Sequence, residues 1–137
     1  MTALYLLLEQ TLPYIKQLLR EQGSFYPIAT VMKLNGEVEQ VVLEDIEDVA
    51  TPNSAVIMGE LMKLLHWHKN EYKAVTLFYD VYIQEKETDA IAVFAEEKEG
   101  KNACTFYYHY EIFGSKIVFT DSCSIPKRLE FFNDEMA

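Results

Sequence analysis

The sequence predicts an α+β fold, with an antiparallel sheet of about six strands and two helices packed on one face of the sheet. Three observations carry this prediction. Residues 3–22 and 51–72 repeat apolar side chains at the spacing of amphipathic helices. An Asn-Gly pair at positions 35 and 36 separates two extended runs, which indicates a β-hairpin. Four further extended runs follow between residues 74 and 122, and their short connections favour antiparallel neighbours.

The first helix is predicted from its apolar stripe. The positions expected to face the core lie three or four residues apart: Leu4, Leu8, Thr11, Ile15, Leu18 and Leu19. Pro13 has no backbone N–H to donate, so we expect a kink or a break near Thr11 and Leu12. Gly23 is the expected end of the helix, because glycine accepts the left-handed conformation that closes many helices.

The predicted hairpin joins residues 25–34 to residues 37–43. Asn35 and Gly36 form its turn, because both tolerate the positive φ that a two-residue turn requires.

The second helix is predicted to begin at Thr51 and Pro52, which have the pattern of an N-cap and a first helical position. It is expected to continue to about Tyr72.

The remaining strands alternate in side-chain character. They are expected at residues 74–84, 90–97, 103–113 and 116–122. Pro126 then begins a C-terminal segment, and we expect one short helix over Lys127–Phe132.

Length and charge limit the classes of function. The 137 residues fit a single domain, 1–137. The chain has 12 basic and 22 acidic side chains, a formal charge of −10, which disfavours nucleic acids and anionic membranes as partners. Glu9 interrupts the apolar start, and no segment reaches the roughly 18–20 apolar residues of a spanning helix. We therefore expect a cytoplasmic protein.

No motif predicts a cofactor, a metal site or a catalytic residue. His66 and His68 point to nearly opposite sides of a helix, and His109 lies alone on a strand. Cys104 and Cys123 match no short metal or redox motif, so we expect two structural thiols. The five glycines are isolated, which argues against a nucleotide-binding loop. We expect a protein that is not an enzyme.

The strongest regional feature is acidic. Seven acids and no Lys or Arg lie between Leu34 and Met62. Such a patch can bind a basic protein by charge complementarity, and a solvated loop with no partner is the alternative. Our leading hypothesis is a non-enzymatic interaction domain that presents six of these residues to a basic partner: Glu37, Glu39, Glu44, Asp45, Glu47 and Asp48.

A second regional feature is aromatic. Six residues are expected on the sheet face away from the helices: Phe78, Asp80, Tyr82, Tyr107, His109 and Phe113. A face this aromatic is either covered by a second subunit, giving a homodimer, or lines a pocket. The alternative function is therefore a small-ligand-binding or enzymatic domain with its pocket on the sheet face.

Two stretches carry a resemblance to a known class. Phe25-Tyr26-Pro27-Ile28-Ala29 leads to Asn35-Gly36-Glu37, and Thr88-Asp89-Ala90-Ile91-Ala92-Val93 leads to Glu96 and Glu97. In these stretches, which cover less than a third of its length, the chain resembles small uncharacterised bacterial α+β proteins. The class includes immunity proteins that neutralise toxins, and by this analogy the resemblance implies a protein-binding function without catalytic residues.

Overall fold

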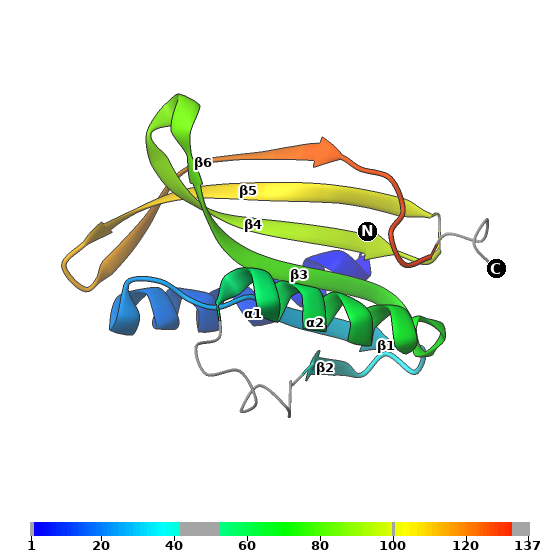
Figure 1. Ribbon diagram of the computed structural model, residues 1–137. Helices are drawn as coiled ribbons and strands as arrows, with labels where there is room; N and C mark the ends of the chain where they lie inside the picture. The colour runs from blue at the N-terminus through cyan, green and yellow to red at the C-terminus, as the bar shows by residue number, and fades with distance from the viewer. Residues whose placement is uncertain (1, 42–52, 100, 133–137) are drawn as a thin grey trace.

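The computed structural model describes residues 2–41, 53–99 and 101–132 (Figure 1). It confirms the α+β class and the antiparallel sheet of six strands. In chain order the main elements are α1 (Thr2–Gln22), β1 (Ile28–Lys33), β2 (Val38–Val41), α2 (Ser54–Trp67), β3 (Tyr72–Ile83), β4 (Thr88–Glu97), β5 (Asn102–Phe113) and β6 (Lys116–Pro126). None of the helices in these ranges is long and apolar enough to cross a membrane.

The sheet has the order β2-β1-β3-β4-β5-β6, and every neighbouring pair is antiparallel. The β1–β2 hairpin therefore lies at one side of the sheet, with β1 also paired to β3. Strands β3 to β6 form the predicted meander. Of the two outer strands, β2 has four residues and β6 has eleven.

The predicted β-hairpin is confirmed, but its turn is not the predicted two-residue one. Asn35 does not have a positive φ, and the Gly36 N–H donates to the Lys33 carbonyl over 2.9 Å, so the loop spans residues 34–36. Gly36 has a φ of 93°, which only glycine adopts at little cost. The Lys33 N–H donates to the Glu37 carbonyl over 2.8 Å, and the Asn35 side chain accepts from the Glu37 N–H over 2.9 Å.

The two helices lie on opposite faces of the sheet, which corrects the prediction that both pack on one face. Figure 1 shows α2 in front of β1 and β3, with α1 behind them. The α1 face buries Leu8, Ile15 and Leu19 against Ile28, Phe78, Ile91 and Val93. The α2 face buries Ile57, Leu61 and Leu65 against Ala29, Val31, Val75 and Leu77.

Continuous burial along β1 explains this correction. Residues 28–32 are all buried, although neighbouring side chains in a strand point to opposite faces. A strand whose side chains are buried on both faces needs a packing partner on each face of the sheet. Helix α1 packs on one face of β1 and helix α2 on the other. Thr30 remains compatible with the α1 face because its hydroxyl bonds those of Thr11 and Thr76, over 3.0 and 2.6 Å.

Helix boundaries differ from the prediction at Pro13 and at both ends of α2. Helix α1 continues through Pro13 without a break. Pro13 and Glu9 are exposed, so water can satisfy the carbonyl that loses its helical partner. Asn53 is the N-cap of α2 and accepts from the Val56 N–H over 3.0 Å, while Thr51 and Pro52 lie outside the described residues.

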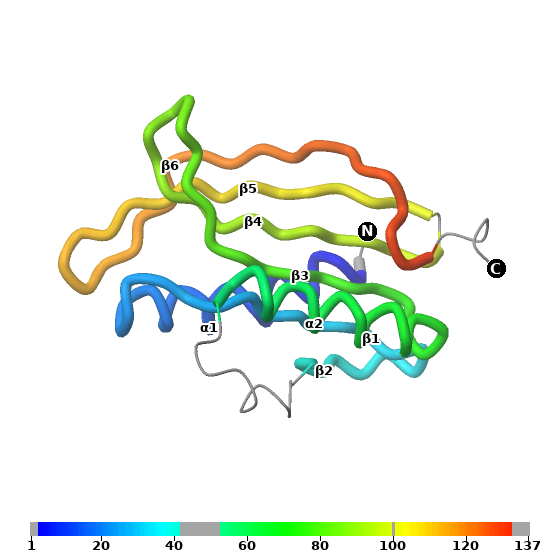
Figure 2. The backbone as a smooth tube through the Cα atoms, viewed as in Figure 1, coloured from blue at the N-terminus to red at the C-terminus, as the bar shows by residue number. Residues whose placement is uncertain are grey.

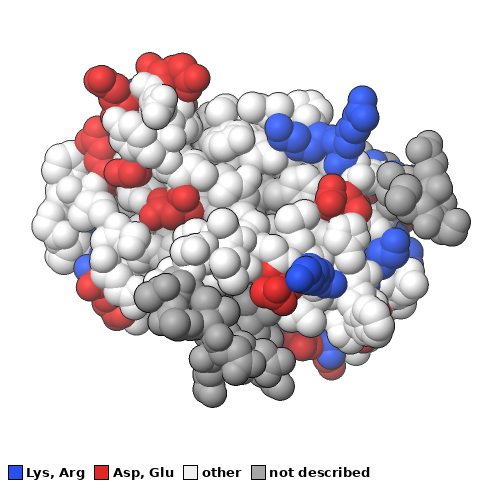
Figure 3. Space-filling model, viewed as in Figure 1, with Lys and Arg blue, Asp and Glu red and all other residues white. Residues whose placement is uncertain are grey.

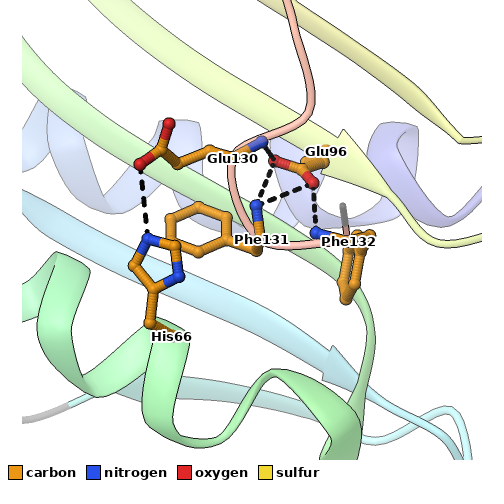
Figure 4. A network of polar contacts seen from close by, with 5 residues as sticks. All are labelled: His66, Glu96, Glu130, Phe131 and Phe132. Carbon is orange, nitrogen blue, oxygen red and sulfur yellow. Dashed lines mark hydrogen bonds and ion pairs between the residues drawn. The ribbon is translucent and has the colours of Figure 1, made fainter. Parts of the chain in front are cut away.

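The C-terminal segment is not the predicted helix. Residues 127–132 run across the end of the sheet and are held by Glu96, whose side chain is fully buried (Figure 4). Its carboxylate accepts the backbone N–H groups of Glu130, Phe131 and Phe132 over 2.6–3.1 Å. These bonds replace the helical ones, and they seat both phenylalanines in the core under α2.

Candidate functional site

The candidate site lies on the α2 face, over the half of the sheet that α2 leaves open. The hairpin that joins β3 to β4, residues 82–88, curves over this half (Figure 2). Gln84–Lys86 form a single 3₁₀ turn in it, and Glu87 is left-handed with a φ of 48°. The hairpin and the open strands line a cavity of about 560 Å³ that is open to solvent, here called the sheet-face cavity. This volume is in the range of small-molecule sites.

The floor of the sheet-face cavity is aromatic because β4 contributes only alanine beneath it. Strand register places Ala92 between Tyr79 on β3 and Tyr107 on β5, and Ala90 between Val81 and His109. Both alanines are fully buried, so the larger neighbours close over them. Tyr79, Tyr107 and His109 therefore line the sheet-face cavity together with residues of the hairpin.

His109 is the most unusual residue of this floor. Only 3% of it is exposed, yet it lines the sheet-face cavity. Within the described ranges, no residue forms a hydrogen bond or an ion pair with its ring. Its ring nitrogens are not among the buried polar atoms that lack a partner in the described part of the chain, so they reach the cavity and can hydrogen-bond water or a ligand there.

The Tyr79 hydroxyl of the floor has a raised pKa and remains protonated at neutral pH. Burial raises the pKa of Tyr79, and the neighbouring Tyr107 raises it further. Protonated phenols donate as well as accept hydrogen bonds, so the floor carries no negative charge of its own.

The charges of the site lie on its rim. Lys86 of the hairpin reaches Asp121 on β6, with 3.7 Å between Nζ and Oδ2. Glu85 adds one more carboxylate at the rim. On the face shown in Figure 3, acidic side chains gather near the β3–β4 hairpin, and the basic ones lie mainly toward the other end of the sheet. The cavity therefore opens on an acidic surface.

The two cysteines lie on opposite faces of the sheet. Cys123 is exposed and lines the sheet-face cavity, opposite Tyr107 in the register of β5 and β6. Cys104 packs against the α1 face, where burial raises the pKa of its thiol. Both are free, and their placement prevents a disulfide between them.

The predicted aromatic group divides between the two faces. Tyr82, Tyr107 and His109 all line the sheet-face cavity. The prediction is wrong for Phe78, which is fully buried under α1, and for Asp80, which faces the α1 side. Phe113 lies outside the cavity, exposed next to the β5–β6 turn. Strand parity accounts for Phe78 and Asp80, which differ by an odd number from Tyr79 and Val81. It does not account for Tyr82, which shares their parity and lines the cavity where β3 enters the hairpin.

Asp80 belongs to a separate, smaller cavity of about 380 Å³ near the end of α1. Its Oδ1 accepts a hydrogen bond from the Tyr110 hydroxyl over 2.7 Å. Burial raises the pKa of Asp80, and the hydrogen bond from Tyr110 opposes that rise.

The structure describes only two of the six acidic residues predicted to bind a partner. Glu37 and Glu39 are exposed at β2, and Glu39 forms an ion pair with Lys33 at 2.8 Å. The other four, Glu44, Asp45, Glu47 and Asp48, lie outside the described residues.

The described part of the chain contains no group of three or more His, Cys, Asp or Glu side chains that could hold a metal ion. His66 contacts Glu130 over 3.3 Å, and its ring packs at a tilt of 56° against Phe131, with 4.7 Å between ring centroids (Figure 4). His68 bonds the Glu71 carboxylate.

Sequence reasoning missed Tyr79, Lys86 and Cys123 as residues of one site. Alternation alone shows that Tyr79 and Val81 share a face. Only the strand register adds that Tyr107, His109 and Cys123 lie on the same face.

No protein-family model, curated protein or solved structure matches the chain.

Proposed function

We propose that the protein is a small-ligand-binding domain and that its ligand occupies the sheet-face cavity. The single observation that carries this proposal is the buried ring of His109, which faces a cavity of about 560 Å³ without a hydrogen-bonding partner among the described residues. A ligand in contact with the aromatic floor would supply that partner and bury apolar surface at the same time.

Cys123 provides a direct measurement of occupancy. In a Cys104→Ser background, the rate of Cys123 alkylation by iodoacetamide is measured with and without a panel of small fragments. Occupancy of the cavity slows alkylation. A fragment that slows it should also perturb the NMR signals of the His109 ring, because both residues line the same cavity.

A matched pair of variants separates cavity binding from surface effects. Ile125→Trp places an indole in the sheet-face cavity, whereas Ser124→Trp places the same bulk at the neighbouring position on the other side of β6. We expect the first variant to abolish protection of Cys123 and the second to preserve it. Protection that persists in Ile125→Trp, or the absence of any protecting fragment, would refute the proposal.

A second candidate is the acidic interaction surface. It is supported by the exposed Glu37 and Glu39 at edge strand β2, in a stretch with no Lys or Arg between Leu34 and Met62. Reversing Glu44, Asp45, Glu47 and Asp48 to Lys should abolish capture of a basic protein from lysate at low salt. Unchanged capture would refute this candidate.

We place the protein in the cytoplasm, which its two free thiols support.

A further inference from the structure

The floor and the roof of the sheet-face cavity restrict the shape of its ligand. The floor is made of the rings of Tyr79, Tyr107 and His109, which close over Ala90 and Ala92. The roof is the β3–β4 hairpin, which contributes Tyr82 and the 3₁₀ turn at Gln84–Lys86. Aromatic floors favour flat rings, because stacked or tilted contacts add to the gain from burial.

The charges around the cavity restrict the charge of its ligand. Lys86, which lines the cavity, is already paired with Asp121. An anion would face Glu85 and Asp121, and the chain as a whole carries a formal charge of −10. A cation would have to leave water for a floor formed by Tyr79, Tyr107 and His109, which carry no carboxylate. The carboxylate of the lining, Glu85, lies on the hairpin instead.

The imidazole restricts the polar group of the ligand. His109 presents one donor and one acceptor when neutral, and the polar side chains that share the lining with it are mainly uncharged, apart from Glu85 and Lys86 of the hairpin. A hydrogen-bonding group on the ring edge can pair with one of the two imidazole nitrogens, and the tyrosine hydroxyls and the Gln84 amide are the uncharged polar partners that the lining adds.

We propose that the sheet-face cavity binds a flat, uncharged ring compound that stacks on Tyr79 and Tyr107 and hydrogen-bonds His109. This inference rests on the ligand-binding function proposed above and names its ligand class. Compounds that carry a phosphate or a carboxylate are excluded from the class. The hydrogen bond to His109 orients the ring, and the hairpin covers its outer side.

A probe series with one ring and three charges tests the ligand class. Indole is uncharged, indole-3-acetate is an anion and tryptamine is a cation at neutral pH. Binding is followed by the His109 ring signal in NMR and by the alkylation rate of Cys123 in the Cys104→Ser background. We expect indole to bind at least about tenfold more tightly than either charged probe.

Two matched variants test the role of the imidazole. His109→Phe keeps a ring in the floor and removes the hydrogen bond, so it should weaken indole binding about tenfold when alkylation is the readout. His68→Phe makes the same change beyond the end of α2, outside the cavity, and should leave binding unchanged. Equal affinity of indole for His109→Phe and the wild-type protein would overturn the proposal.

The outcomes separate this inference from the ligand-binding function itself. A charged probe that binds as tightly as indole would overturn the ligand class. An aliphatic fragment such as cyclohexanol that protects Cys123 when indole does not would also overturn the class, while the ligand-binding function would stand. If no fragment or probe protects Cys123, the ligand-binding function fails as well.

Discussion

The Tyr110 hydroxyl donates a hydrogen bond to Asp80 Oδ1 over 2.7 Å, reaching from β5 to β3 across the intervening strand β4. Tyr110 is 2% exposed, and its ring packs in the cluster under α1. Burial holds the pKa of Tyr110 far above its ordinary value, and the hydrogen bond to Asp80 raises this pKa further. The pair thus ties the centre of the sheet to its β5 side by a polar contact inside an apolar cluster.

Tyr110→Phe should lower the free energy of unfolding by about 1.5–3 kcal/mol, as expected for a lost hydrogen bond to a charged group. The ring and its packing remain, so the loss reports the hydroxyl alone. Urea denaturation at neutral pH measures it. Tyr26→Phe is the control, because Tyr26 is exposed. Equal effects of the two substitutions would contradict the role of the Tyr110–Asp80 bond.

Asp80→Asn should change how stability depends on pH. The folded pKa of Asp80 lies above its ordinary value of 3.8, mainly because of burial. The folded protein therefore binds this proton more tightly than the unfolded chain, and stability falls as the pH rises from 3.8 through the folded pKa. Asn does not titrate, so the variant should gain stability relative to wild type as the pH rises. A pH-independent difference in urea midpoints would rule this out.

Glu96→Gln should release the C-terminal segment and lower the free energy of unfolding by about 3 kcal/mol. An amide cannot accept all three backbone N–H groups as the carboxylate does, and its own NH₂ group would point at donors. Trypsin should then cleave faster after Lys127 and Arg128, as mass spectrometry would detect. Glu111→Gln, at an exposed position of β5, serves as the control. Resistance to trypsin equal to that of the wild-type protein would contradict this account.

Lys86→Glu should open the hairpin over the sheet-face cavity. The substitution replaces attraction to Asp121 with repulsion, and exposed pairs of this kind contribute up to about 1 kcal/mol. A bulky maleimide should therefore reach Cys123 about two- to fivefold faster in a Cys104→Ser background. The charge swap Lys86→Glu with Asp121→Lys should restore the slow rate. If it does not, the ion pair does not hold the hairpin.

The two thiols should react at clearly different rates with a disulfide reagent such as dithionitrobenzoate. Cys123 is exposed, whereas burial raises the pKa of Cys104 and so reduces its reactive thiolate at neutral pH. One fast and one slow phase are expected, and Cys123→Ser should remove the fast phase. Air oxidation should not join the two within one molecule, since they lie on opposite faces. An intramolecular disulfide detected by mass spectrometry would contradict this arrangement.

Local sequence signals were sufficient for most helices and strands, although not for the C-terminal segment. The β1–β2 hairpin follows from the turn preference of Asn35 and Gly36, and the alternation along β3 follows from the pleat of a single strand. The side of the sheet on which each helix packs depends on a longer-range fact, the pairing of β1 with β3. That pairing makes β1 an inner strand with two covered faces, and no local pattern specifies it.

The candidate site was predictable only in part, for the same reason. Tyr107 and His109 are two residues apart on one strand, so their shared face follows from the sequence. Tyr79, Lys86 and Cys123 join them through the register of β3 to β6 and the curve of the β3–β4 hairpin. The role of Glu96 as an anchor was equally hidden, because its backbone partners are 34–36 residues away.

Strand β6 has a consequence for the behaviour of the protein at high concentration. It is an outer strand of eleven residues, and its free edge offers backbone donors and acceptors to any extended chain. Pro126 blocks only its final residue. The formal charge of −10 holds such edges apart between molecules at neutral pH. Acidification toward the isoelectric point removes this repulsion, so edge-to-edge growth into fibrillar aggregates is expected to begin at β6.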